Sequence, residues 1–211
     1  MTIAIKLGLT FLAISFWIIS QKMIGRRQQK FKNGVGDYIH IFTNRWNLYL
    51  YNSPKLSNAL LISSSLIIDI LGLFIIATTL IGETLRPLLS LIILFALRQV
   101  NQVITVLPTP ERMIWRDPGV PSIFVTYGVS NDLFFSGHTA LAVLGALEIG
   151  TLNQPSLQIL ATLVVVFEVA VVLLLRAHWT MDVFAGIVAA LWAHDFSVRL
   201  SPTLDQWIGS F

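Results

Sequence analysis

The sequence has little of what a soluble enzyme depends on. Only 12% of its 211 residues are charged, about half the share of an ordinary soluble domain. So few charges cannot cover the surface of a globule in water, which excludes a soluble enzyme, a disordered chain and a nucleic-acid-binding domain. The chain also has no cysteine, which excludes a disulfide framework, a thiolate nucleophile and a metal site built on thiolates.

Apolar residues take the place of the missing charges. They make up 55% of the chain, and its mean hydropathy is +0.75. A transmembrane helix needs about 20 apolar residues, and six stretches qualify: roughly residues 3–20, 58–80, 85–106, 137–152, 156–176 and 180–200. We therefore predict an all-α polytopic membrane protein with six transmembrane helices. We expect the first to be a retained span, because no small-residue cleavage site of a signal peptide follows it.

We predict a single transmembrane domain over residues 1–211, with a catalytic core at about 85–200 and an N-terminal part at 1–57. Two connectors between the spans are long. Residues 21–57 combine basic and aromatic residues, which fits an interfacial helix or a surface loop. Residues 107–134 hold four prolines and cannot be helical throughout.

Histidines and charged residues concentrate in two short elements, residues 132–139 and 176–182. Ionisable residues at membrane depth are costly and therefore mark functional candidates. His138 and His178 are 40 residues apart, which corresponds to two crossings of about 20 residues each. Because the chain crosses and returns, we expect both histidines on the same membrane face, at neighbouring helix ends.

His178 and Asp182 are four positions apart, so they share one face of a helix. A carboxylate there can accept a hydrogen bond from one imidazole nitrogen, fix the tautomer and raise the basicity of the other nitrogen. The second histidine, His138, could then donate a proton. Together these residues supply an oriented nucleophile and a general acid.

The neighbouring residue types indicate a phosphate ligand. The guanidinium groups of Arg98 and Arg176 can each donate two parallel hydrogen bonds to the oxygens of a phosphate. Ser136 and Gly137 at the start of a helix would present backbone N–H groups to an anion. Asp132 opens the same element and completes the set of expected substrate-binding residues. A histidine nucleophile among such groups suits phosphoryl transfer through a phosphohistidine.

Other ionisable residues lack this context. We expect His40 and His194 to be structural. Asp69 and Arg98 come from adjacent antiparallel spans at similar depth, so we predict that they pair. The two histidines and Asp182 could hold a metal ion, but without cysteine or further acids nearby we expect no metal and no cofactor.

These residues resemble the type 2 phosphatidic acid phosphatase superfamily. The finer resemblance is to its branch of sphingomyelin synthases and plant phosphatidylcholine:diacylglycerol cholinephosphotransferases. Three motifs carry it: an arginine-led segment ending in Leu-Pro-x-Pro (98–110), Asp-x-x-x-Ser-Gly-His-Thr (132–139) and His-aromatic-Thr-x-Asp (178–182). Together they cover most of residues 98–186, and six spans also agree with the family.

The resemblance implies roles for the matching positions. His178 would be the nucleophile and Asp182 would orient it. His138 would protonate the leaving diacylglycerol oxygen and then deprotonate the incoming acceptor. The phosphate would be held by three further residues, Ser136, Gly137 and Arg98. The family uses no metal for this reaction.

The sequence departs from the simple lipid phosphatases of this superfamily. Those usually carry Pro-Ser-Gly-His, whereas Phe135 precedes Ser136 here. They usually place an arginine six residues before the last histidine, where this chain has Val172; Arg176 is only two residues before His178. Their Lys-x6-Arg-Pro motif is absent from this chain. These departures favour head-group transfer over simple phosphate hydrolysis.

We therefore expect a membrane enzyme that moves a phospho-head group, above all phosphocholine, from a glycerophospholipid to a diacylglycerol-like or ceramide-like acceptor. The alternative is a lipid phosphatase or phospholipase C-type hydrolase that uses the same residues with water. A non-catalytic lipid-binding scaffold is a third candidate, against which the complete set of two histidines and an aspartate argues. The expected partners are lipids within the membrane; a nucleic acid is not expected, and a homo-oligomer is left open.

The basic segment bears on which side of the membrane the site faces. Its charges are Lys22, Arg26, Arg27, Lys30, Lys32, Arg45 and Lys55 against Asp37. This segment and the site both follow odd-numbered spans, so they share one face, which the positive-inside rule places in the cytosol. Sphingomyelin synthases have their site on the lumenal or exoplasmic side instead. We expect an integral protein of the endoplasmic reticulum or another endomembrane, with a cytosolic site.

Overall fold

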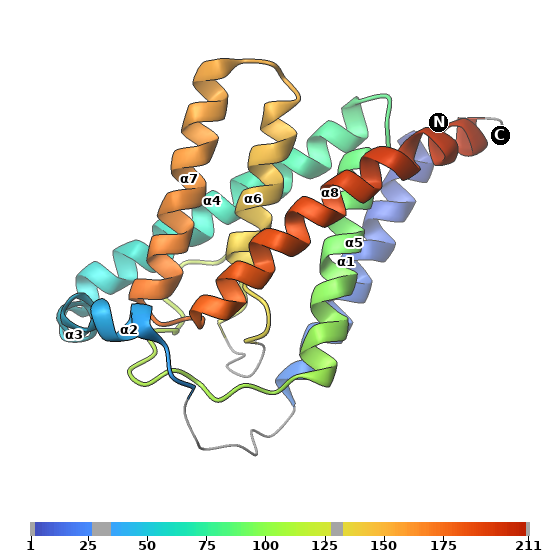
Figure 1. Cartoon of the computed structure of the whole chain (residues 1–211). Coiled ribbons are helices and arrows are strands. Elements are labelled where there is room, and N and C mark those ends of the chain that lie inside the picture. Colours follow the sequence, from blue (N-terminus) through green and yellow to red (C-terminus); the bar gives the residue numbers. More distant parts are fainter. Residues whose placement is uncertain (1–2, 27–34, 128–132, 210–211) are drawn as a thin grey trace.

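A computed structural model describes residues 3–26, 35–127 and 133–209, and all regular elements in these ranges are helices (Figure 1). They are α1 (Ile3–Gly25), α2 (Tyr38–Phe42), α3 (Asn44–Tyr51), α4 (Pro54–Ile81), α5 (Arg86–Ile104), α6 (Gly137–Gly150), α7 (Pro155–Leu174) and α8 (Thr180–Gly209). Five of them, all but α2, α3 and α6, are long and apolar enough to cross a membrane. The predicted all-α polytopic membrane protein is confirmed.

The sixth expected span is a short helix surrounded by the others. α6 has 14 residues, about 21 Å of helix, whereas a bilayer core is about 30 Å thick. Residues 140–144 of α6 are all buried, and the helix packs against α4, α7 and α8. The predicted range of 137–152 extended two residues beyond the end of this helix. Its central position could not be predicted, because an apolar run does not show which helices will pack around it.

Prolines and a serine determine where several helices begin. Pro54, Pro87 and Pro155 lie in the first turn of α4, α5 and α7, where the fixed φ of proline favours a helix and its missing N–H is not needed. Ser136 caps α6, because its Oγ accepts a hydrogen bond from the Thr139 N–H at 3.3 Å. These local signals place helix starts at both ends of the bundle.

One end of the bundle gathers the elements that carry the histidines. α1, α5 and α7 end there, and α4, α6 and α8 begin there, in the lower part of Figure 1. The connector between α5 and α6 runs across this end and forms no helix in its described residues. The prediction that residues 107–134 are not helical throughout is therefore correct. The described part of the basic segment also lies at the end with the histidines, as predicted.

The N-terminal connector forms the two short helices α2 and α3. Between them they expose eight large apolar side chains: Tyr38, Ile39, Ile41, Phe42, Trp46, Leu48, Tyr49 and Tyr51. A surface loop is therefore wrong for most of residues 38–51, and short helices with an exposed apolar face favour the interfacial alternative. Residues 27–34 of this connector lie outside the described part of the chain.

The predicted pair of Asp69 and Arg98 is wrong. Asp69 accepts hydrogen bonds from Ser122 Oγ at 2.9 Å and from the backbone N–H groups of Ile123 and Phe124. It therefore holds the connector after α5 against α4. The similar positions of Asp69 and Arg98 along neighbouring spans did not predict this contact. The connector folds back against α4 and brings backbone N–H groups that need an acceptor.

A buried ion pair lies at the end of the bundle opposite the histidine elements. Arg86 donates to Glu148 at 2.7 Å, and the Glu148 side chain is only 1% exposed. His194 Nε2 lies 3.7 Å from the same carboxylate. His194 therefore lies at the opposite end of the bundle from His138 and His178.

Removing one partner of this ion pair should lower the stability of the fold more than removing both charges. Arg86→Gln leaves the Glu148 carboxylate buried without its cation, which we expect to lower the free energy of unfolding by about 3 kcal/mol. The double variant Arg86→Gln with Glu148→Gln should recover part of that loss. Unfolding midpoints in detergent micelles measure both, and a double variant no more stable than the single one would contradict this account.

Candidate functional site

The turn that carries His178 is fixed by the end of α7. The Ala177 N–H donates to the Val172 carbonyl at 2.9 Å, and the Arg176 N–H donates to the Leu173 carbonyl at 3.2 Å. This is the Schellman pattern of a helix C-terminus. It places Arg176 in the left-handed region with φ of 54°, where a residue other than glycine costs about 1 kcal/mol.

Hydrogen bonds of the Arg176 guanidinium offset this cost. It donates to the Glu111 carbonyl at 2.9 Å, the His40 carbonyl at 3.0 Å and Asn44 Oδ1 at 2.9 Å. Burial lowers the pKa of Arg176 from its usual value. Its head group therefore connects the end of α7 to α2, α3 and the long connector.

α2 packs directly behind His178. His40 Nε2 lies 3.0 Å from the His178 carbonyl oxygen, and the His40 ring stacks on Trp179 with centroids 5.1 Å apart. Because a carbonyl only accepts, His40 Nε2 carries a proton. Burial lowers the pKa of His40, which agrees with a neutral ring in this position.

Asp37 joins α2 to the first residue of α8. Its carboxylate accepts hydrogen bonds from the Thr180 N–H at 2.7 Å and from Thr180 Oγ1 at 2.8 Å. It also caps α2 by accepting from the N–H groups of Ile39 and His40. Burial acts to raise the pKa of Asp37, but these hydrogen bonds outweigh it and hold the pKa below its usual value. Asp37 therefore remains an anion that fixes the start of α8.

The His178 side chain has a defined tautomer. Its Nδ1 lies 3.0 Å from the Leu133 carbonyl oxygen and 3.3 Å from Asp182 Oδ2. Both partners are acceptors, so Nδ1 carries the proton and Nε2 presents a lone pair. The Trp179 N–H donates to Asp182 Oδ2 at 3.1 Å and holds the carboxylate in place. His178 and Asp182 thus lie together as predicted, but they do not share a helix face, because His178 lies in the turn before α8 and only Asp182 is on the helix. The Leu133 carbonyl is an additional partner.

A backbone contact joins the two sequence elements. The Ser136 N–H donates to the Asp182 carbonyl at 3.0 Å. A Cβ atom at Gly186 would lie 2.8 Å from the Ser136 carbonyl oxygen, so α8 can approach this closely only with a glycine there. Ser136 and Asp182 are both fully buried and lie behind the two histidines.

Arg98 lies against the start of α6. A Cβ atom at Gly137 would be 3.1 Å from Arg98 Nε, and that Nε donates to the Phe135 carbonyl at 3.2 Å. The glycine therefore lets the guanidinium rest beside the helix N-terminus, where backbone N–H groups and the helix dipole attract anions.

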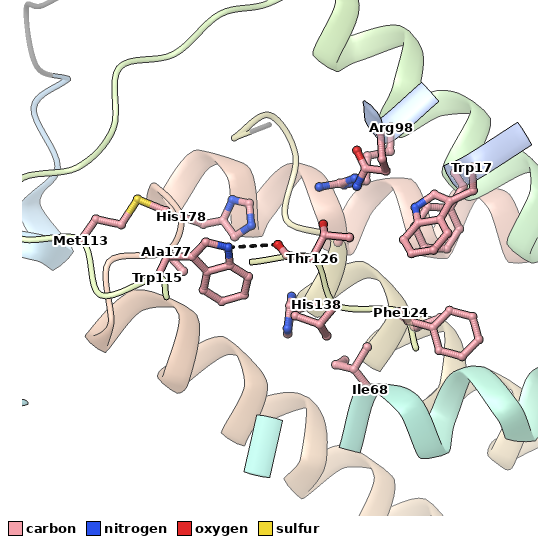
Figure 2. A pocket seen from close by; sticks show the side chains of 15 residues that line it. Trp17, Ile68, Arg98, Met113, Trp115, Phe124, Thr126, His138, Ala177 and His178 are labelled. Carbon is pink, nitrogen blue, oxygen red and sulfur yellow. Dashed lines mark hydrogen bonds between the residues drawn. The ribbon is translucent and has the colours of Figure 1, made fainter. Parts of the chain in front are cut away.

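One pocket brings the reactive groups together (Figure 2). His138, His178, Arg98, Gly137 and Trp115 line a cavity of about 40 Å³. The His138 ring packs edge-on to Trp115 with centroids 5.2 Å apart. Its Nε2 is buried and has no hydrogen-bond partner in the described part of the chain. A buried polar atom without a partner is a signal of function, and here it lies in a pocket that can bind an anion and transfer a proton.

The predicted site residues separate into four groups. The pocket is lined by His138, His178, Arg98 and Gly137, and Ser136 and Asp182 lie behind them. Arg176 instead lines a neighbouring cavity of about 470 Å³, and its guanidinium donates to α2, α3 and the connector. Asp132 lies outside the described residues. Asp37 and His40 were missed, because they are 143 and 138 residues away from the groups that they bond.

The contact at Gly186 makes a stability prediction. Gly186→Ala places a methyl group against a backbone oxygen that cannot move cheaply, so we expect a loss of about 1–3 kcal/mol in the free energy of unfolding. Gly8→Ala in α1 is the matched control, since a Cβ there meets nothing within 4 Å. Thermal unfolding in detergent compares the two, and equal midpoints would refute the close approach.

Neutral His40 should make stability depend on pH. Its pKa is lower in the folded state, so its contribution is complete above about pH 6.5, the unfolded value, and is lost as the pH falls through the folded pKa. His40→Asn keeps an N–H donor but cannot be protonated. We expect the wild type to lose more stability than His40→Asn between about pH 7 and pH 5, measured as unfolding midpoints. Equal losses would show that His40 is not held neutral.

Comparison with known proteins identifies the family of the chain. A model of the AtPDCT1/2 family matches residues 36–199. Over 170 residues the chain is 25% identical to phosphatidylcholine:diacylglycerol cholinephosphotransferase 1 of Arabidopsis thaliana, which covers 81% of this chain and 54% of that protein. The chain therefore spans about half the length of this relative. No solved structure is a significant match. Because the family match includes both histidine elements and most of the chain, the chain belongs to the AtPDCT1/2 family.

Proposed function

We propose that the protein transfers a phosphocholine head group from phosphatidylcholine to diacylglycerol. The family and the name of the Arabidopsis relative support this donor and acceptor. The observation that carries the proposal is the tautomer of His178. It is fixed with the proton on Nδ1, because Nδ1 faces two acceptors, Leu133 O and Asp182 Oδ2. Its Nε2 lone pair is therefore available to attack phosphorus without a further base.

In the first half-reaction, Nε2 of His178 attacks the phosphorus of phosphatidylcholine. A P–N bond forms and the P–O bond to diacylglycerol breaks, while protonated His138 gives its proton to the leaving oxygen. The products are free diacylglycerol and phosphocholine bound to His178. Asp182 stabilises the positive charge that the phosphorylated imidazole acquires.

In the second half-reaction, the chemistry runs in reverse with a new lipid. His138, now neutral, accepts the proton of the diacylglycerol hydroxyl as its oxygen attacks phosphorus. The new P–O bond forms, the P–N bond breaks, and His178 regains its lone pair. His138 is protonated again, so the cycle consumes no net proton.

The pocket walls support both steps. Arg98 and the N–H groups at Gly137 would hold the phosphate oxygens while charge builds on them. Phe135 and Leu133 are each 2% exposed and help to keep the reacting centre dry. The same residues with water as acceptor would make a phospholipase C-type hydrolase. We propose that the protein belongs to the wider type 2 phosphatidic acid phosphatase superfamily, whose chemistry includes both transfer and hydrolysis.

A lipid exchange assay tests the proposal. Purified protein receives phosphatidylcholine labelled with ³²P and unlabelled diacylglycerol with different acyl chains. We expect the label in phosphatidylcholine that carries the new chains. His178→Ala should abolish this exchange, and Asp182→Asn should lower kcat by roughly 10⁴-fold, as for another carboxylate that orients a catalytic histidine. His194→Ala, far from the pocket on α8, is the control and should keep the activity.

The outcomes separate the competing functions. Without an acceptor, the wild type should hold protein-bound ³²P after a quench in base, and His178→Ala should not. Full exchange in His178→Ala would rule out the mechanism. Label released as water-soluble phosphocholine in the presence of diacylglycerol would instead show a hydrolase. A parallel reaction with ceramide tests the other acceptor.

A further inference from the structure

A narrow apolar groove lies between α1 and α5 and continues the histidine pocket. It is a cavity of about 90 Å³. Trp17, Phe95 and Phe124 line both this groove and the histidine pocket, and the Trp17 ring centroid lies 6.3 Å from each of the other two. Figure 2 shows Trp17 and Phe124 on the side of the pocket opposite His178. The groove therefore leads away from the nucleophile along α1.

α1 is packed loosely beside this groove. Only 11% of its apolar span is buried. It is attached at the far end of the bundle, where the Lys6 ammonium donates to the Leu80 and Gly82 carbonyls. Near the site, α1 meets α5 through the ring contact of Trp17 with Phe95. A lipid could therefore enter between α1 and α5 without breaking the attachment at Lys6.

Three polar side chains at the groove and pocket have atoms without a partner. Trp17 Nε1, Gln21 Oε1 and both amide atoms of Gln99 are buried and make no hydrogen bond to any described residue. Gln21 and Gln99 are each only 5% exposed. Gln99 lines the groove, Gln21 lines the pocket and Trp17 lines both. Such atoms are costly at membrane depth, so this arrangement calls for a ligand that is apolar but carries hydrogen-bonding groups.

We propose that the groove binds the diacylglyceryl part of a glycerolipid. One acyl chain lies between α1 and α5, and the ester carbonyls accept hydrogen bonds from Trp17 Nε1 and Gln99 Nε2. The free hydroxyl of diacylglycerol can donate to Gln21 Oε1. A protein helix is about 10 Å wide and does not fit a cavity this narrow, whereas a chain of methylene groups does.

This inference rests on the proposed function and says where its lipid body lies. When the P–O bond of the donor breaks, the group that leaves is a diacylglycerol, and the acceptor is a diacylglycerol too. One groove can therefore present both oxygens to His138 from the same position. The diacylglycerols exchange between α1 and α5 while phosphocholine stays on His178, and a second lipid pocket is not needed.

A binding measurement with two matched lipids tests the groove. Dioctanoylglycerol has two ester carbonyls, and its dioctyl ether analogue has none. Trp17→Phe keeps an aromatic ring but removes the N–H donor together with part of the indole, so the difference between the two lipids, which share this loss of packing, is the readout. We expect Trp17→Phe to weaken the Kd for the ester about fivefold, the effect of one hydrogen bond, and to leave the Kd for the ether unchanged. Gln99→Leu should give the same pattern, with calorimetry in detergent as the readout.

The controls separate this role from a structural one. Trp192→Phe, on the exposed side of α8, should change neither affinity. The proposal would be overturned if Trp17→Phe and Gln99→Leu weakened the affinity for both lipids equally or for neither lipid. Either result would show that these side chains do not bind an ester carbonyl. The exchange assay reports on the proposed function independently. If Trp17→Phe and Gln99→Leu weaken the binding of the ester alone but the wild type shows no transfer, the groove proposal stands and the proposed function is wrong. If the wild type shows transfer but these variants do not distinguish ester from ether, the proposed function stands and the groove proposal is wrong.

Discussion

The close contact between the start of α6 and the first turns of α8 is the constraint on which the site depends. The Ser136 N–H donates to the Asp182 carbonyl, and Gly186 leaves room for the Ser136 carbonyl. The positions of both histidines follow from this contact, because His138 is two residues after Ser136 and His178 is four residues before Asp182. If it opened, the histidines would separate even with every helix intact.

The polar groups around this contact are buried, and short segments supply their hydrogen-bond partners. A buried polar group without a partner is costly. Arg176 therefore donates to two carbonyls and an amide oxygen, and Asp37 accepts from the first residue of α8. α2, which has only five residues, is held by both, and its His40 in turn fixes the carbonyl of His178. The short N-terminal helices are thus part of the support of the site.

Features with a local signal could be predicted from the sequence, and features that depend on tertiary contacts could not. The spans follow from apolar runs. The pairing of His178 with Asp182 was predicted from their four-residue spacing, but it forms across the turn before α8 and not on one face of the helix, which begins at Thr180. Asp37 and His40 could not be found this way, because their partners are more than a hundred residues away. The pairing of Asp69 failed because depth along a helix does not tell which neighbour a side chain faces. The predicted range of α6 was two residues too long because the apolar Leu152 follows the end of the helix at Gly150.

The charge of the pocket bears on which phosphate ester it suits. Within the described part of the chain, Arg98 is the only arginine or lysine that lines the cavity with the two histidines, since Arg176 points its donors elsewhere. A phosphate monoester carries about −1.5 to −2 charges at neutral pH, whereas the phosphodiester of phosphatidylcholine carries a single one. In the proposed first half-reaction, protonated His138 adds a second positive charge, which leaves with the proton that the departing oxygen takes up. Once the head group is bound to His178, Arg98 is therefore the remaining cation beside it. The phosphate of bound phosphocholine carries a single charge and matches this guanidinium, whereas the phosphate left by a monoester would keep charge unpaired in a medium of low dielectric constant. We infer that the pocket favours a phosphodiester donor, and with it head-group transfer over the hydrolysis of phosphatidic acid.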